Sequence, residues 1–450
     1  MKALPRLFVT LITLAILLSA CAAPATPPTA SENEAPTAPS TEGPASPPTE
    51  AVGIHVLAME QAGATVDEMN SIASEFNQKN PNITVNIDYV SYDALHDKIT
   101  TSMASTLPAY DVFLVDDIWY AEFADKGFIL DITDELDQST KDNVFEAAWE
   151  ISTVDGRVYG MPWLLDQKYF FYNEELLKQA GFNSPPKTWE ELVEQANAIK
   201  EQGIVEYPIV WSWGQYEAAI CDWVTLLYGN GGKLVDESGK PMFNDATGVK
   251  TLEWMVNTID EGITNPASVS YAEEDVRNVF SSGKAVFALN WNYMYDLANN
   301  QPDQSQVTGN VQMALMPAFA GSGVESGTID GSMGISVAAA SPNSDAAWEY
   351  VRYLTSQDVQ DRFSAHMLPI WATSFEGAAG EKLANTNSVT AVTVPMFNAQ
   401  FPFSHVRPKV PFYVEGSKAL QLALQRALTK QVTPQEALDE AAATWEKLMQ

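Results

Sequence analysis

Residues 53–90 read GIHVLAMEQAGATVDEMNSIASEFNQKNPNITVNIDYV, and this stretch decides the fold class. Residues 53–59 form a short apolar run, as in a strand that is buried in a sheet. Thr65 and Glu68 then have the spacing of a capping box, and the segment after them keeps its apolar side chains on one helical face. Residues 83–90 alternate apolar and polar side chains, which indicates a second strand. A strand, a helix and a strand in this order predict an α/β fold with a parallel sheet.

The same pattern continues along the chain. In residues 111–115 (DVFLV), four consecutive apolar residues follow Asp111, which is typical of a strand covered on both faces. A second series of strands and helices is predicted at residues 168–173, 187–203, 206–211, 214–232 and 285–291, with a helical block at 414–449. We therefore predict two α/β lobes, with a chain that crosses between them more than once.

The composition limits the function classes. The chain has 450 residues, which is too long for one hydrophobic core and favours two lobes. It carries 58 acidic and 25 basic residues, a net charge of -33. Nucleic-acid binding requires a basic surface, so this charge argues against it. An acidic, solvated surface is the simpler interpretation.

The first residues read MKALPRLFVTLITLAILLSAC. Two basic residues precede the apolar run 7–18, which is short for a membrane span. The last four residues, ending at Cys21, resemble a bacterial lipobox, in which the thiol of the cysteine receives a lipid. We predict a signal peptide at 1–20 and a lipid anchor on Cys21; an ordinary cleaved signal, with Cys21 incidental, is the alternative. Residues 22–51 are rich in Pro, Ala, Thr and Ser and predict a disordered linker, so that the protein is extracytoplasmic and anchored to the cell membrane.

Several candidate binding residues follow predicted strands. Ligands of open α/β sheets bind beyond the carboxyl ends of the strands. This rule selects Glu60, Gln61, Asp116, Asp117, Trp119, Trp211, Trp213 and Trp291, and Trp163 and Asp166 lie in the connection between the two series. Aromatic rings pack against the C–H face of a sugar, and carboxylates and amides bind its hydroxyls. The pattern predicts a sugar site, with the alternative that each tryptophan belongs to the core.

Catalytic and metal motifs are not evident. Asp116 and Asp117 are adjacent, so at a strand end they point apart and do not form an acid–base pair. The four histidines are scattered without metal-ligand spacing, and no nucleotide-binding motif lies between a strand and a helix. Cys221 is the only other cysteine and is expected to be a buried apolar residue. We predict no enzymatic activity, no cofactor and no metal.

Longer stretches carry a family resemblance from about residue 52 to the end of the chain. They include residues 75–90, 110–136, 159–196, 282–295 and 331–363. In order and spacing, the chain resembles the extracellular solute-binding proteins of bacterial ABC importers, the large group that includes maltose-binding protein.

The resemblance implies a two-lobe periplasmic-binding-protein-like fold of type II, with mixed sheets flanked by helices and several hinge crossings. It implies an N-terminal lobe of 52–162 plus about 289–337 and a C-terminal lobe of 163–288 plus about 338–450. It places Glu60, Gln61, Asp117, Trp119, Trp291, Gly331, Ser332, Met333 and Trp371 at the cleft. Arg407 either reaches the cleft or is structural.

The predicted function is that of the binding component of an ABC importer. It would be a monomer that closes on a neutral mono- or oligosaccharide and delivers it to the membrane permease subunits. A neutral guest is favoured because the candidate positions are rich in tryptophan and poor in basic residues. A secreted glycoside-acting enzyme and a solute sensor for a receptor are the alternatives.

Overall fold

The first sheet is built around β1 (Val52–Met59), the strand at the start of the stretch that decides the fold. The computed structural model describes residues 51–450, apart from the side chains of residues 61 and 62. β1 pairs in parallel with β4 (Ile83–Val90) and β5 (Val112–Asp116), as the sequence predicts. β14 (Met333–Val337) then runs antiparallel to β5 and to β8 (Met161–Leu164). The sheet order is therefore β4-β1-β5-β14-β8, and the predicted mixed α/β fold is confirmed.

Helices such as α1 and α12 cover this sheet because they present an apolar face to it. In α1 the Thr65 hydroxyl accepts from the Glu68 amide while the Glu68 carboxylate accepts from the Thr65 amide, so the predicted capping box is confirmed. Met69, Ile72 and Phe76 of this helix are buried. The helices in this part are α1 (Val66–Lys79), α2 (Tyr92–Met103), α3 (Tyr120–Asp125), α4 (Gln138–Asn143), α5 (Glu146–Ser152), α12 (Ser344–Leu354) and α13 (Gln357–Arg362).

The second sheet has the order β10-β11-β9-β12. Its strands are β10 (Ile209–Val210), β11 (Phe287–Asn290), β9 (Tyr169–Asn173) and β12 (Val311–Ala314). β10 and β11 are parallel, and β9 is antiparallel to β11 and β12. The helices in this part are α6 (Glu174–Gln179), α7 (Trp189–Glu201), α8 (Glu217–Gly229), α9 (Ala246–Asp260), α10 (Glu273–Ser281), α11 (Tyr293–Asn299), α16 (Tyr413–Leu428) and α17 (Pro434–Leu448).

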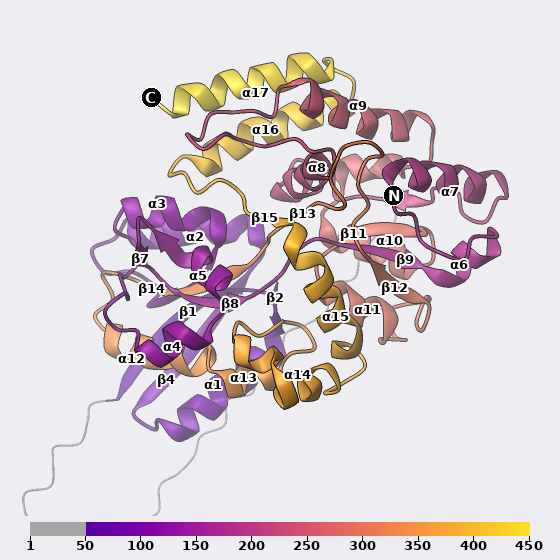
Figure 1. Cartoon of the computed structure of the whole chain (residues 1–450). Helices are drawn as coiled ribbons and strands as arrows, with labels where there is room; N and C mark the ends of the chain where they lie inside the picture. Colours follow the sequence, from indigo (N-terminus) through magenta and orange to yellow (C-terminus); the bar gives the residue numbers. More distant parts are fainter. Residues whose placement is uncertain (1–50) are drawn as a thin grey trace, which may run out of the picture. The chain divides into compact units, whose positions relative to one another are not determined.

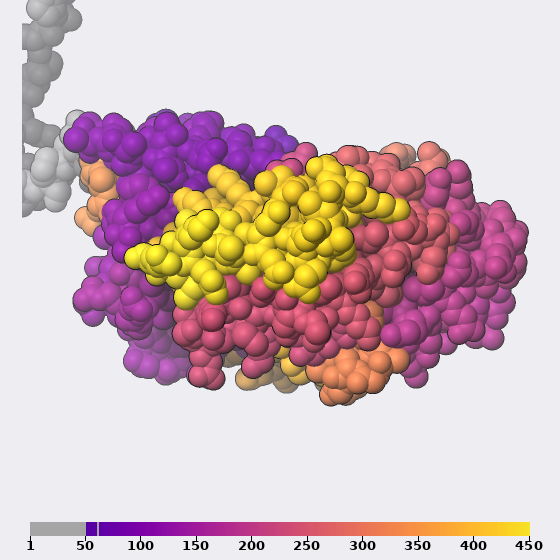
Figure 2. All heavy atoms as spheres, turned by 90° about the horizontal axis from the view of Figure 1, so that it is seen from above, coloured from indigo at the N-terminus to yellow at the C-terminus, as the bar shows by residue number. Residues whose placement is uncertain are grey.

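Each of the two later segments that the sequence assigns to a single lobe contributes elements to both parts of the fold. Residues 289–337, predicted for the N-terminal lobe, contribute β12 to the second sheet and β14 to the first. Residues 338–450, predicted for the C-terminal lobe, include α12, which packs against β14 and β1. α16 and α17 pack against each other and against α9, and Figure 2 shows this C-terminal part, in yellow, on the surface.

Crossing segments join the two sheets. Residues 165–168 lead from β8 to β9, and beside them run β13 (Thr328–Ile329) and β15 (Ser404–His405), which pair in parallel. Lys168 donates its amide to the Ile329 carbonyl at 3.1 Å. Figure 1 shows β13 and β15 between the two sheets. The predicted repeated crossing is therefore present, and it holds three distant segments of the chain together.

The remaining elements of the described chain are four two-residue strands, two helices that lie between α13 and α16, and several 3-10 turns. They are β2 (Gln61–Ala62), β3 (Ala64–Thr65), β6 (Thr153–Val154), β7 (Arg157–Val158), α14 (Gly377–Ala384), α15 (Thr390–Gln400) and the 3-10 turns Asp117–Trp119, Pro266–Ser270, Ala372–Phe375 and Phe401–Phe403. Within residues 51–450, no helix has the length and apolar character needed to cross a membrane. Cys21 and the predicted signal peptide lie outside the described residues.

Candidate functional site

A cavity of about 300 Å³ is lined by elements that belong to both sheets. The end of β1, the start of α2 and the end of β5 contribute from the first sheet. The starts of α8, α10 and α11 contribute from the second sheet. The side chains on its wall include Met59, Glu60, Tyr92, Asp93, Asp116, Asp166, Tyr216, Glu217, Cys221, Glu273, Glu274, Trp291, Tyr293, Met333, His366 and Arg407. A cavity of this volume is at the lower end of the range for small-molecule sites.

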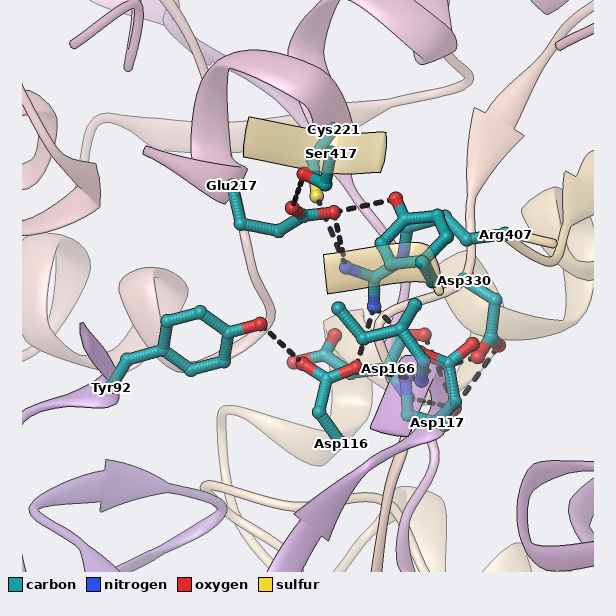
Figure 3. A network of polar contacts seen from close by, with 12 residues as sticks. Tyr92, Asp116, Asp117, Asp166, Glu217, Cys221, Asp330, Arg407 and Ser417 are labelled. Atoms are coloured by element: carbon teal, nitrogen blue, oxygen red, sulfur yellow. Dashed lines mark hydrogen bonds and ion pairs between the residues drawn. The ribbon is translucent and has the colours of Figure 1, made fainter. Parts of the chain in front are cut away.

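Arg407 is the buried centre of a charged network on the cavity wall (Figure 3). Its Nη2 lies 2.9 Å from Asp116 Oδ1 and 2.7 Å from Asp117 Oδ1, and its Nη1 lies 3.0 Å from Glu217 Oε1. Tyr92 donates its hydroxyl to the second oxygen of Asp116 at 2.9 Å. Burial would lower the pKa of Arg407, but the surrounding carboxylates raise it well above its usual value. Both Nη atoms of the guanidinium are therefore paired with protein carboxylates, and these come from both parts of the fold.

Trp291 lies directly after β11 and is partly exposed on the cavity wall. Its indole Nε1 donates to Glu273 Oε1 at 3.2 Å. Tyr92, Tyr216 and Tyr293 also line the cavity, so its aromatic wall comes from both sheets. Such flat apolar surfaces next to carboxylates match the two kinds of surface on a sugar.

Asp166 and Asp330 lie on the crossing segments: Asp166 is between β8 and β9, and Asp330 directly follows β13. Asp166 Oδ1 accepts the amides of Gln167 at 2.8 Å and Asn292 at 3.2 Å, and Asp330 accepts from the Ser332 amide at 3.0 Å. Burial raises the pKa of Asp166 to about 7 and that of Asp330 to about 6, although these hydrogen bonds oppose the shift. Near neutral pH, Asp166 is therefore able to donate as well as to accept a hydrogen bond.

His366 joins α1 to α11 at the cavity wall. Its Nδ1 lies 3.2 Å from Glu68 Oε2, and its Nε2 lies 3.2 Å from Asp296 Oδ2. Burial would lower the pKa of His366, but hydrogen bonds to Asp296 and Glu68 raise it to about 9. The His366 hydrogen bond in turn lowers the pKa of Asp296 to about 2. His366 is thus a cation at neutral pH that holds a carboxylate on each side.

The stability that His366 contributes should depend on pH. A pKa raised from 6.5 to about 9 stabilises the folded state below about pH 6.5, and this contribution is lost as the pH rises through 9. On the acid side it is lost once Glu68 and then Asp296 are protonated. We expect His366→Gln to lower the free energy of unfolding by roughly 3 kcal/mol near pH 5.5, at about 1.4 kcal/mol per pKa unit, and by little above pH 9. Urea unfolding at three pH values measures this.

The control for this prediction is His55→Gln, at an exposed position on β1. It should produce no comparable loss at any pH. A loss for His366→Gln that is the same at pH 5.5 and 9.5 would mean that the ion pairs are not its cause.

The structure brings part of the predicted site together. The predicted residues on the cavity wall are Glu60, Asp116, Asp166, Trp291, Gly331, Met333 and Arg407. Asp117 and Ser332 lie beside it: both are buried, Asp117 binds Arg407, and the Ser332 hydroxyl donates to Asp330. The side chain of Gln61 lies outside the described residues.

Five predicted tryptophans do not reach the cavity. Trp119, Trp163, Trp211 and Trp213 are buried in the core, with exposures of 3 % or less. Trp211 and Trp213 stack on each other with ring centroids 4.9 Å apart, and Trp211 also packs against Trp189 of α7 and Trp254 of α9. Trp119 stacks under Tyr92, and Trp371 lines a separate small hollow of about 80 Å³. These residues are corrected from candidate ligand contacts to packing residues.

Several wall residues were not predicted from the sequence. They are Tyr92, Asp93, Tyr216, Glu217, Glu273, Glu274, Tyr293 and His366. Most of them lie at or beside the start of a helix that follows a strand, as Tyr92 begins α2 after β4 and Glu217 begins α8 after β10. The rule that selects ligand contacts beyond strand ends can therefore be extended to the first turn of the helix that follows the strand. Both positions can be recognised in the sequence. Within residues 51–450, no group of three or more His, Cys, Asp or Glu side chains is arranged to hold a metal ion.

Comparison with known proteins places this chain in a family. A family model for bacterial extracellular solute-binding proteins matches residues 62–361. A probable ABC transporter-binding protein of Deinococcus radiodurans is 30% identical over 402 residues, which cover 85% of this chain and 90% of that protein. The maltose-bound structure of MalE3 from T. maritima is 29% identical, with a TM-score of 0.81 over 88% of this chain and 100% of that one.

A ribitol complex of a solute-binding protein from Agrobacterium radiobacter K84 shares the fold, at 22% identity and a TM-score of 0.78 over 89% of this chain and 100% of that one. The predicted resemblance is confirmed, and proteins of this kind are substrate-binding components of ABC transporters rather than enzymes. The chain belongs to the bacterial extracellular solute-binding protein family.

Proposed function

We propose that this chain captures a neutral carbohydrate or polyol in the cavity between its two sheets and delivers it to the permease of an ABC importer. The observation that carries the proposal is the position of Trp291, which is partly exposed on the cavity wall beside carboxylates from both sheets. The maltose-bound and ribitol-bound relatives support the same class of guest.

The charges on the cavity wall support an uncharged guest. The two cations on the wall, Arg407 and His366, already bind protein carboxylates. An anionic guest, such as a sugar phosphate, would have to compete for them. Most of the wall carboxylates are also engaged: Arg277 binds Glu274, and Lys168 lies 3.8 Å from Glu273. A guest that presents hydroxyl groups fits the remaining acceptors without adding a buried charge.

The contacts across the cavity support a mechanism of closure. A guest that touches both walls stabilises the arrangement in which they are close together, and it shifts the population toward that state. The crossing segments would act as the hinge, since they are the connections that both walls share. The proposed contacts are Glu60, Asp166, Trp291, Met333, Tyr92 and Tyr293, with Gln61 as a further candidate.

The location and the anchor are part of the proposal. The family implies an extracytoplasmic protein. We propose in addition that Cys21 carries a lipid, that residues 22–51 tether the folded part to the membrane, and that the protein works as a monomer. The mass of the N-terminal peptide of membrane-extracted protein tests the anchor: an unmodified Cys21 would remove it.

A thermal-shift panel tests the ligand class. The panel comprises glucose, maltose, ribitol, mannitol, glucosamine, glucose 6-phosphate and leucine. A guest present at 100 times its dissociation constant should stabilise the protein by about 2.7 kcal/mol. We expect a shift with at least one neutral sugar or polyol and none with glucose 6-phosphate. A shift with glucose 6-phosphate or leucine alone would contradict the proposal.

A further inference from the structure

The indole of Trp291 is held by three separate segments of the chain. Glu273, at the start of α10, accepts from its Nε1 at 3.2 Å. The ammonium of Lys168 lies 4.7 Å from the centroid of its ring. Gly331 gives the ring its space, because a Cβ at that position would lie 2.3 Å from Cζ3 and 2.4 Å from Cη2 of Trp291. These contacts favour the orientation that the indole has in the structure.

Lys168 is an unusual partner because its side chain is completely buried. Its Nζ lies 3.2 Å from Asp222 Oδ1, 3.8 Å from Glu273 Oε1 and 3.4 Å from Ser212 Oγ. A buried ammonium without such partners would cost several kcal/mol. Burial lowers the pKa of Lys168, but Asp222 and Glu273 raise it further than burial lowers it. The side chain is thus a permanent cation, and it does not lie on the cavity wall.

The backbone of Lys168 belongs to the crossing segments. Its amide donates to the Ile329 carbonyl at 3.1 Å, and its carbonyl accepts from the Thr328 hydroxyl at 2.7 Å. Gly331, on the adjacent crossing segment, donates its amide to the Asp166 carbonyl at 3.0 Å. Two of the three groups that fix Trp291 are therefore attached to the connections between the sheets.

We propose that Lys168 is a positioning residue for Trp291: its buried ammonium holds the indole from behind, directly and through Glu273, and so sets the affinity for a guest that it never touches. This inference rests on the proposed function for its link to affinity. A cation placed against an indole attracts the electron-rich face of the ring, and the attraction is strongest where both are shielded from water. Lys168 also holds Glu273, which fixes the edge of the same ring.

The test uses variants that separate the effect of the buried Lys168–Asp222 charges on stability from the effect of Lys168 on the position of Trp291. Lys168→Met alone leaves Asp222 buried without its cation and is expected to destabilise the fold. The double variant K168M/D222N removes both charges and should recover much of that stability. Asp222→Asn alone keeps Lys168 beside Glu273 and Trp291 and serves as the matched control.

Two readouts are compared in full-length protein. The first is the ¹⁹F resonance of Trp291 in protein that contains 5-fluorotryptophan, assigned by its loss in Trp291→Ala. The second is the affinity for whichever of maltose, ribitol and mannitol gives the largest thermal shift. We expect K168M/D222N to move or broaden the Trp291 resonance and to weaken binding about tenfold. D222N should change the affinity by less than about threefold.

A double-mutant cycle shows whether Lys168 acts through Trp291. In a Trp291→Ala background, K168M/D222N should cause no further loss of affinity. Three results would each overturn the inference. The first is a further loss of affinity in the Trp291→Ala background that equals the loss in the wild-type background. The second is a wild-type affinity of K168M/D222N together with recovered stability, and the third is an unchanged Trp291 resonance in that variant. If none of the neutral sugars and polyols of the panel binds the wild-type protein, the proposed function fails, and the resonance alone then decides whether Lys168 positions Trp291.

Discussion

Arg407→Ala is expected to lower the free energy of unfolding by about 3–5 kcal/mol, the usual cost of removing one partner from a buried ion pair. The side chain of Arg407 is 2% exposed and binds Asp116, Asp117 and Glu217. Without it, these carboxylates would be buried side by side with no cation between them. The loss should therefore grow as the pH rises and the carboxylates ionise. Urea unfolding at pH 5 and pH 8 measures both effects.

The control is Arg426→Ala, which removes an ion pair at the surface. Arg426 binds Glu440, and both side chains are substantially exposed, at 30% and 56%. Exposed pairs contribute about 0–1 kcal/mol, so this variant should remain close to the wild type. Similar stabilities for the two variants would show that the network around Arg407 is not a structural centre of the protein.

Trp291→Ala is expected to weaken binding of the sugar or polyol found in the panel by about 2 kcal/mol or more, which is about 30-fold. Among residues 51–450, Trp291 is the tryptophan whose indole lines the cavity. Its removal deletes the flat apolar contact while the carboxylates on both walls remain. Titration calorimetry with the wild-type and variant proteins measures the change.

Trp371→Ala is the matched control for this variant. Trp371 is also partly buried, and it donates its Nε1 to the Thr355 carbonyl at 2.9 Å, but it lies outside the cavity. We expect the Trp371→Ala variant to bind the sugar or polyol with the affinity of the wild type. Equal affinities for Trp291→Ala and the wild type would remove Trp291 from the site.

Local patterns in the sequence predict much of this fold. The strands expected at 53–59, 83–90 and 111–115 appear as β1, β4 and β5, within a residue of their predicted ends. They are recognisable because burial of one or both faces of a strand leaves a periodic or continuous apolar pattern. The capping box of α1 is equally local. The strand-end rule selects Trp291 in the same way, since it directly follows a buried strand.

The rest depends on contacts that no local pattern records. Trp211 follows an apolar strand just as Trp291 does, yet helices cover the end of β10 and bury it. The Arg407 network joins residues that are 290 positions apart, as in its pair with Asp117. The sequence left Arg407 undecided between a cleft and a structural role. In the structure Arg407 lies on the cavity wall, and both its Nη atoms are paired with protein carboxylates.

The crystal structure of the protein with the best neutral ligand of the panel tests the central claim most directly. The claim is that both sheets contribute to one site for an uncharged, hydroxyl-bearing guest. The predicted result is a ligand in the cavity, with its apolar face against the indole of Trp291 and its hydroxyls bonded to residues from each sheet, Asp166 or Glu60 among them. A ligand bound outside this cavity, or one that contacts residues of a single sheet only, would contradict the account.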